Sequence, residues 1–185
     1  EIRDKETAAL AVQAALTGHL VFTTLHTNTA VGAIPRLIDM GVDPYLIAPT
    51  LKMVIAQRLV RKLCPGTGKK MPLQGSLKMM VDKQFETLPP EYRGKVSMGS
   101  ELYGIEPSNS CPTGTQGRVG VFELFTMSEN IENAILKNPV EEEIEQIARN
   151  EGMLTMKEDA IIKSFDKIIP LEEVNTLGGE LYEEE

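Results

Sequence analysis

The feature that most constrains the fold is an alanine- and leucine-rich segment followed, after a tight turn, by a short apolar run. Thr7–Leu16 (TAALAVQAAL) consists of good helix formers and is apolar on nearly every side, which predicts a buried helix. Gly18 ends this helix, as glycine often does just past a helix end. His19–Leu25 (HLVFTTL) is rich in β-branched and aromatic residues, which predicts a strand buried in a parallel sheet. Helix, turn and strand together form half of an α/β repeat.

A polar loop, His26–Thr29, follows the predicted strand and precedes a predicted helix over Ala30–Met40. Ligands in open α/β sheets bind beyond the carboxyl ends of the strands, so this loop is where we expect a site. The chain has two histidines, His19 and His26, and they flank the predicted strand. A histidine at the carboxyl end can donate to phosphate oxygens. We therefore favour His26 for phosphate contact, whereas His19 could equally brace the sheet.

The rest of the chain is predicted to contain a long helix, an irregular stretch and several short helices. The long helix spans Tyr45–Leu63, so that Arg58 and Arg61 would share one face. The stretch 64–117 is rich in Pro, Gly, Ser and Lys, with one helical segment at Leu77–Phe85. A strand and short helices are then predicted at Val119–Leu124, Ser128–Lys137, Val140–Asn150, Thr155–Phe165 and Leu171–Leu177.

Composition excludes several classes of protein. A net charge of −8 argues against a nucleic-acid binder, which needs basic surface to replace phosphate counterions. No apolar run approaches the roughly 20 residues that span a bilayer, and no signal-peptide pattern opens the sequence, so we expect a cytoplasmic protein. The first residue is not methionine, from which we expect a fragment of a longer chain. The two cysteines, Cys64 and Cys111, are too few for a disulfide framework or a four-ligand zinc site.

A linked series of short motifs runs along the chain. The motifs are Glu1–Ala8 (EIRDKETA), Ala15–Val21 (ALTGHLV), Thr24–Asn28 (TLHTN), Arg36–Val42 (RLIDMGV), Ala56–Pro65 (AQRLVRKLCP) and Gly117–Leu124 (GRVGVFEL). Their order and spacing resemble those of the secretion ATPases that assemble type IV pili and power type II secretion. The resemblance covers nearly the whole chain and is weakest from about Gly66 to Ser110.

This resemblance implies an α/β fold. It implies a partial RecA-like P-loop ATPase core over residues 1–63, a degenerate metal-subdomain equivalent over 64–117, and a mostly helical C-terminal domain over 118–185. It also implies a cytoplasmic homo-hexamer, peripheral to the inner membrane, that hydrolyses ATP with Mg²⁺. The implied partners are a platform protein in the inner membrane and the pilus or secretion machinery.

The resemblance also implies roles for individual residues. Glu1 matches the glutamate that ends the family's Walker B motif, where a carboxylate can orient and deprotonate the attacking water. His26 matches the family's histidine box, and we expect Glu1 and His26 to be catalytic and to lie at the same edge of the sheet. The residues expected to contact the nucleotide are His19, Arg3, Asp4, Thr24 and Thr27.

The sequence departs from the family pattern in two respects. Many relatives bind zinc through two Cys-x-x-Cys pairs, but here Thr67 stands where the partner of Cys64 should be, and Cys111 alone remains near the second pair. We therefore expect a remnant of a four-cysteine site and no bound zinc. No Gly-x-x-x-x-Gly-Lys-Ser/Thr phosphate loop occurs in the 185 residues, so this chain should not bind ATP tightly.

Two other functions remain open. One is a docking or assembly module that joins the same ring without hydrolysing ATP; the missing phosphate loop and cysteines favour it, whereas Glu1 and the histidine box oppose it. The other is a pilus-retraction ATPase, against which Cys64-Pro65 and Gly117–Leu124 weigh. The sequence does not separate pilus assembly from protein secretion.

Overall fold

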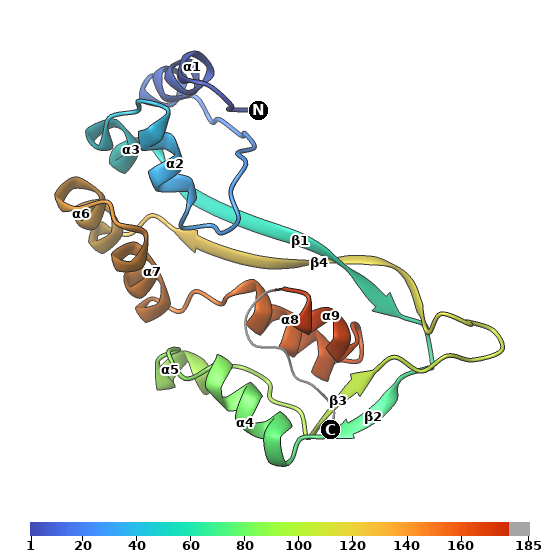
Figure 1. Ribbon diagram of the computed structural model, residues 1–185. Helices are drawn as coiled ribbons and strands as arrows, with labels where there is room; N and C mark the ends of the chain where they lie inside the picture. The colour runs from blue at the N-terminus through green and yellow to red at the C-terminus, as the bar shows by residue number, and fades with distance from the viewer. Residues whose placement is uncertain (178–185) are drawn as a thin grey trace. The chain divides into compact units, whose positions relative to one another are not determined.

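The computed structural model describes residues 1–177, which combine helices with two long strands and two short ones (Figure 1). In chain order the elements are α1 (Lys5–Leu16), α2 (Ala33–Asp39), α3 (Pro44–Thr50), β1 (Met53–Leu63), β2 (Lys69–Pro72), α4 (Gly75–Gln84), α5 (Pro90–Arg93), β3 (Glu101–Gly104), β4 (Thr115–Thr126), α6 (Glu129–Lys137), α7 (Glu141–Asn150), α8 (Met156–Phe165) and α9 (Leu171–Asn175). β1 pairs with β4, and β2 pairs with β3. The prediction of a mixed helix and strand chain is confirmed.

The described residues form two compact units, each with its own hydrophobic core. Unit 1 comprises Glu1–Ala56 and Glu123–Met153, and unit 2 comprises Gln57–Phe122 and the residues from Leu154 onward. The division into segments 1–63, 64–117 and 118–185 stays a prediction.

In unit 1, the helices α6 and α7 confirm the helical spacing of apolar residues seen in the sequence. Ile131 and Ile135 of α6 are buried, as is Ile144 of α7, and all three belong to the core of this unit. The hydroxyl of Ser128 caps α6 by accepting the backbone N–H of Ile131 at 3.2 Å. Apolar periodicity and a capping residue together define this helix.

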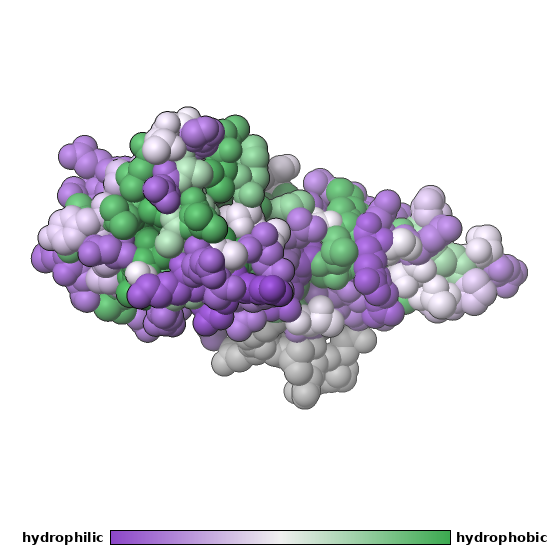
Figure 2. All heavy atoms as spheres, turned by 90° about the horizontal axis from the view of Figure 1, so that it is seen from above, coloured by the Kyte–Doolittle hydropathy of each residue, from purple (hydrophilic) through white to green (hydrophobic). Residues whose placement is uncertain are grey.

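Helix α1 confirms the predicted helix, but the prediction that it is buried was wrong. Ala8 is its one buried residue, while Leu10 and Leu16 are 60% and 53% exposed. Figure 2 views the molecule from the side on which α1 lies and shows apolar surface gathered there. The described residues cover one face of α1 only, and its other apolar residues meet solvent.

The predicted buried strand His19–Leu25 was also wrong. Residues 19–27 form no helix or strand, and Leu20 and Phe22 are 81% and 87% exposed. A strand exists only when a neighbour satisfies its backbone groups. The carbonyl of Thr24 accepts the N–H of Ile2 at 2.9 Å, but no strand among residues 1–177 lies alongside to extend this contact into a ladder.

The predicted long helix Tyr45–Leu63 proved to be a short helix followed by a strand. Helix α3 ends at Thr50, and β1 then runs through Met53–Leu63. Side chains alternate between the two faces of a strand, so Arg58 and Arg61, three residues apart, point to opposite faces rather than sharing one. The pairing of β1 with β4, more than 50 residues later in the sequence, determines this segment's structure.

Unit 2 contains the stretch that the sequence analysis described as irregular. Its predicted helix is confirmed as α4, whose Leu77 and Val81 are buried in the unit's core. The antiparallel pair β2 and β3, with Lys69 opposite Gly104, was not predicted. The predicted C-terminal helices are confirmed as α8 and α9, and α8 begins with a capping box between Thr155 and Glu158.

Candidate active site

The carboxylate of Glu1 and the imidazole of His26 meet in unit 1. His26 Nε2 lies 2.7 Å from Glu1 Oε1, a hydrogen bond that becomes an ion pair when the imidazole is protonated. Both side chains reach solvent, with His26 84% and Glu1 44% exposed. Glu1 and His26 lie together, but not at the edge of a sheet as expected, because neither residue follows a strand among the described residues. Their catalytic roles stay predictions.

The backbone beside Glu1 contributes to this contact. The side chain of Ile2 is buried in the core of unit 1, and its N–H donates to the carbonyl of Thr24 at 2.9 Å. Thr24 precedes His26 by two residues. The bond from Ile2 therefore aligns the start of the chain with the segment that carries His26.

Asp4 and Arg3 form the start of helix α1. The hydroxyl oxygen of Thr7 accepts the backbone N–H of Asp4 at 3.4 Å, which is one half of a capping box. The carboxylate of Asp4 completes the box by accepting the backbone N–H of Thr7 at 2.9 Å, and it also accepts the Thr7 hydroxyl at 2.8 Å. These hydrogen bonds hold the pKa of the Asp4 carboxyl below its usual value. Arg3 is exposed, with its Nε 4.0 Å from Asp4 Oδ2. Asp4 thus anchors the helix that follows Glu1.

The loop after His26 folds back on itself. The hydroxyl of Thr27 donates to the carbonyl of Thr29 at 2.9 Å, and Thr29 Oγ1 accepts the N–H of Gly32 at 3.1 Å. Thr24, before the loop, is exposed and contributes the carbonyl that binds Ile2.

His19 lies at the end of α1 and makes local contacts. Its Nδ1 is 3.0 Å from Thr17 Oγ1 and 3.3 Å from the carbonyl oxygen of Ala14. These contacts close the turn after the helix. The structure therefore brings Glu1 together with His26, and places His19 in the turn that ends α1.

Two carboxylates that the sequence analysis did not select also bind the loop after His26. Ala30 N–H donates to Glu123 Oε1 at 2.7 Å, and the hydroxyl of Thr29 donates to Glu141 Oε1 at 2.8 Å. Glu123 belongs to β4 and is flanked two residues away on each side by buried Val121 and Phe125. A glutamate on the buried side of a strand was the signal that could have identified it.

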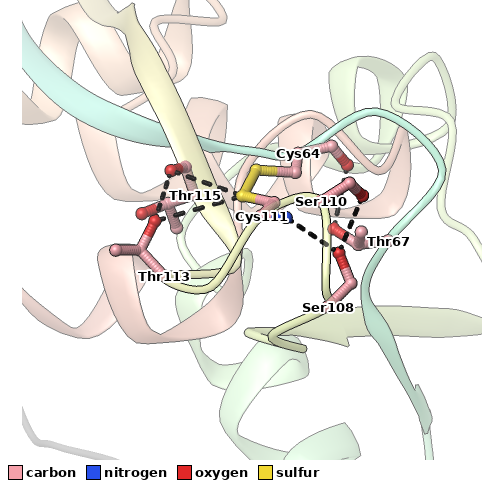
Figure 3. Close-up of a disulfide and its surroundings, with 7 residues drawn as sticks. All are labelled: Cys64, Thr67, Ser108, Ser110, Cys111, Thr113 and Thr115. Carbon is pink, nitrogen blue, oxygen red and sulfur yellow. Dashed lines mark hydrogen bonds between the residues drawn. A yellow bond between two sulfur atoms is a disulfide. The ribbon is translucent and has the colours of Figure 1, made fainter.

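Cys64 and Cys111 form a disulfide in unit 2, which the sequence analysis did not predict (Figure 3). Cys64 is buried, directly after β1, and its N–H donates to the carbonyl of Gly114 at 3.1 Å. The hydroxyl of Thr67 donates to the carbonyl of Cys64 at 2.9 Å. Thr67, which stands where the resemblance implies a cysteine, therefore closes the turn after Cys64.

Residues 1–177 show neither a cluster of metal ligands nor a membrane-spanning helix. No group of three or more His, Cys, Asp and Glu side chains converges there in a way that could hold a metal ion. None of the helices in this part of the chain combines the length and apolar character needed to cross a membrane.

Comparison with known proteins places the chain in a family. The family described as "Type II/IV secretion system protein" matches residues 1–176. The chain belongs to this family. Type II secretion system protein E of Xanthomonas campestris is 40% identical over 174 residues, which cover 94% of this chain and 29% of that protein. Type IV pilus assembly ATPase PilB of Thermus thermophilus is 42% identical over 176 residues, covering 94% of this chain and 19% of that protein.

The matched residues 1–176 include every motif that carried the resemblance in the sequence. A third relative, type IV pilus assembly ATPase TfpB of Acinetobacter baylyi, is 37% identical over 176 residues. This secretion-family chain spans between 19% and 32% of the length of the curated relatives it matches. The relatives' names therefore describe proteins several times longer.

We expect the purified secretion-family chain to contain well under one zinc ion per molecule. Two thiolates supply half of the four ligands that a structural zinc site needs, and in the disulfide both sulfurs are bonded to each other. Elemental analysis before and after reduction checks this, together with the effect of a chelator on the thermal midpoint. One zinc per chain in the reduced protein, with a midpoint that falls on chelation, would contradict it.

Proposed function

We propose that this chain is the C-terminal portion of a hexameric secretion ATPase, in which ATP hydrolysis powers type IV pilus assembly or type II protein secretion. Family membership and the names of the relatives support the general function. The 2.7 Å contact between Glu1 and His26 supports the assignment of catalytic roles to these two residues. An accessible carboxylate beside an accessible imidazole suits the orientation of water next to a phosphate.

The pair fits an accessory role at bound ATP and Mg²⁺ better than a role as their main binding site. Both side chains are accessible and neither is enclosed, so each can reach a ligand in front of it. Glu1 would orient the attacking water and accept its proton, and His26 would donate a hydrogen bond to phosphate oxygen. Bound Mg²⁺ would neutralise the phosphate charge that develops during hydrolysis. Among the other candidates, Arg3 and Asp4 lie within three residues of Glu1 in the sequence and Thr24 and Thr27 lie within two of His26, whereas His19 is held at the end of α1.

The exposed segment around Leu20 and Phe22 supports the assignment of residues 1–63 to part of a RecA-like core. Two large apolar side chains, two residues apart and 81% and 87% exposed, form a surface that another segment could bury. In the proposed parent protein, the segment that supplies the phosphate loop would lie there. The metal-subdomain equivalent (64–117) and the helical C-terminal domain (118–185) complete the proposed division.

The proposal includes a setting for the parent enzyme. It is a homo-hexamer in the cytoplasm, at the face of the inner membrane, where it acts on a platform protein and the pilus or secretion machinery. Nucleic acid is not among its proposed partners. A protein that binds phosphate backbones needs a basic surface, and a chain with a net charge of −8 does not favour one.

Extending the chain tests the proposal. The 185 residues alone should hydrolyse no measurable ATP, because they contain no phosphate-loop motif. In ATPases of this type the backbone amides of that loop make most of the hydrogen bonds to the phosphates. A chain extended upstream with the corresponding segment of a relative should hydrolyse ATP, measured as phosphate release. Turnover by the bare chain would refute the account. An extended chain that assembles into a ring without turnover would instead favour a non-hydrolysing docking module, and one that drives pilus retraction would favour the retraction branch.

A further inference from the structure

The loop between His26 and helix α2 is bound by two carboxylates from distant parts of the sequence. Glu123 Oε1 accepts the N–H of Ala30 at 2.7 Å, across 93 residues of sequence. Glu141 Oε1 accepts the hydroxyl hydrogen of Thr29 at 2.8 Å, across 112 residues. Both contacts lie within unit 1. Strand β4 and helix α7 thus hold adjacent residues of one loop.

Glu123 occupies a position at which a strand of this kind usually carries an apolar residue. It is 6% exposed, and its neighbours on the same face of β4, Val121 and Phe125, are 0% and 4% exposed. Burying a carboxylate is costly unless hydrogen bonds compensate. The bond from the Ala30 amide is short and charge-assisted, the kind that offsets this cost. Glu123 therefore holds the backbone of the loop from inside the core.

Glu141 holds the same loop from the first turn of α7. A Cβ added at Gly32 would lie 2.9 Å from Thr29 Oγ1 and 3.4 Å from Glu141 Oε1, so the loop approaches these groups closely. Thr29 Oγ1 also accepts the N–H of Gly32 at 3.1 Å. The hydroxyl of Thr29 therefore donates one hydrogen bond, to Glu141, and accepts another, from Gly32. These two bonds fix its orientation.

These contacts extend back to His26. The hydroxyl of Thr27 donates to the carbonyl of Thr29 at 2.9 Å, which ties the residue after His26 to the anchored part of the loop. His26 itself is 84% exposed, and its ring is held by the 2.7 Å bond to Glu1, a residue that is also exposed, so packing around the ring restrains it little.

We infer that Glu123 and Glu141 are positioning residues that hold the His26 loop so that the imidazole faces Glu1. They act through the loop and do not touch the reacting groups. The consequence for ATP hydrolysis rests on the proposed function, whereas the consequence for the loop does not.

Amide hydrogen exchange and histidine NMR on the 185-residue chain test the positioning directly. In Glu123→Ala the Ala30 amide should exchange about tenfold faster or more, the scale of losing a hydrogen bond to a charged group. Glu141→Ala should speed exchange at Gly32. In both variants the ring signals of His26 should move and its contact with Glu1 should weaken, while those of His19 stay in place. Glu123→Gln keeps an acceptor oxygen and should restore the Ala30 protection.

Two matched variants separate positioning from general stability. Glu142→Ala removes an exposed carboxylate from the same turn of α7, and Glu173→Ala removes another carboxylate that is 6% exposed, in unit 2. Neither should change exchange at Ala30 or the ring signals of His26. If Glu123→Ala and Glu141→Ala lower stability as Glu173→Ala does, yet leave the His26 signals unchanged, the inference is wrong.

In the extended chain, Glu123→Ala should lower kcat by on the order of a hundredfold, as a misplaced catalytic group does, and Glu142→Ala should not. An extended wild-type chain without turnover would refute the proposed function, and the exchange and ring signals would still decide the positioning. Full kcat in Glu123→Ala, with His26 displaced, would show that hydrolysis does not use this placement.

Discussion

Glu1→Gln in the upstream-extended chain will lower the rate of ATP hydrolysis by about a hundredfold or more, the scale of losing a general base. Glutamine keeps an oxygen that can accept the hydrogen bond from His26 Nε2, now 2.7 Å from Glu1 Oε1. The substitution therefore removes the carboxylate that would accept the proton of the attacking water, and it keeps the contact between residue 1 and His26. Steady-state phosphate release at saturating ATP measures the effect.

Two histidine variants and a carboxylate control complete this test. His26→Ala should impair hydrolysis without unfolding the chain, because the ring is 84% exposed. His19→Ala should act mainly through stability, because its ring contacts close the turn after α1. Glu6→Gln, an exposed carboxylate in the first turn of α1, should keep the wild-type rate. A Glu1→Gln enzyme with wild-type turnover would remove Glu1 from the catalytic step.

The helices of this chain could be predicted from the sequence because their determinants are local. In α6, Ser128 supplies the cap, and Ile131 and Ile135 recur at helical spacing. In α8, Thr155 and Glu158 form the capping box within four residues of one another. No distant contact is needed to recognise either pattern.

The strands could not be predicted as well because their determinants lie elsewhere in the chain. Met53–Leu63 has enough apolar residues to satisfy a helical pattern, and only its pairing with β4 makes it a strand. His19–Leu25 has the composition of a buried strand, yet residues 1–177 provide no strand beside it. β-propensity describes a side chain's fit to neighbours, and the local sequence does not contain those neighbours.

The candidate site shows the same division. The family motifs singled out Glu1 and His26, and a backbone bond from Ile2 to Thr24 joins the two segments that carry them. Glu123 and Glu141 were missed because their partners lie 93 and 112 residues away. The pairing of Cys64 with Cys111 was missed for the same reason, at a separation of 47 residues.

Loss of the Cys64–Cys111 disulfide will lower the free energy of unfolding of the oxidised chain by about 4 kcal/mol. A cross-link removes conformations from the unfolded chain, and a loop of this length, with a sequence separation of 47, gives that magnitude. The closed loop holds β2, α4, α5 and β3, which makes it a substantial part of unit 2. Urea unfolding of the Cys111→Ser variant, followed by circular dichroism, measures the loss.

Reduction distinguishes the cross-link from the side chains themselves. Dithiothreitol should bring the wild-type protein down to the stability of Cys111→Ser and should leave the variant unchanged. The folded arrangement should persist, because the Cys64 N–H bond to the Gly114 carbonyl and the Thr67 hydroxyl bond to Cys64 do not need the sulfurs. Cytosolic reductants keep most thiols reduced, so in the proposed compartment the less stable form would prevail unless the buried Cys64 sulfur is shielded. Equal stability of the oxidised wild type and Cys111→Ser would contradict this prediction. It would mean that the surrounding hydrogen bonds alone account for the stability of this region.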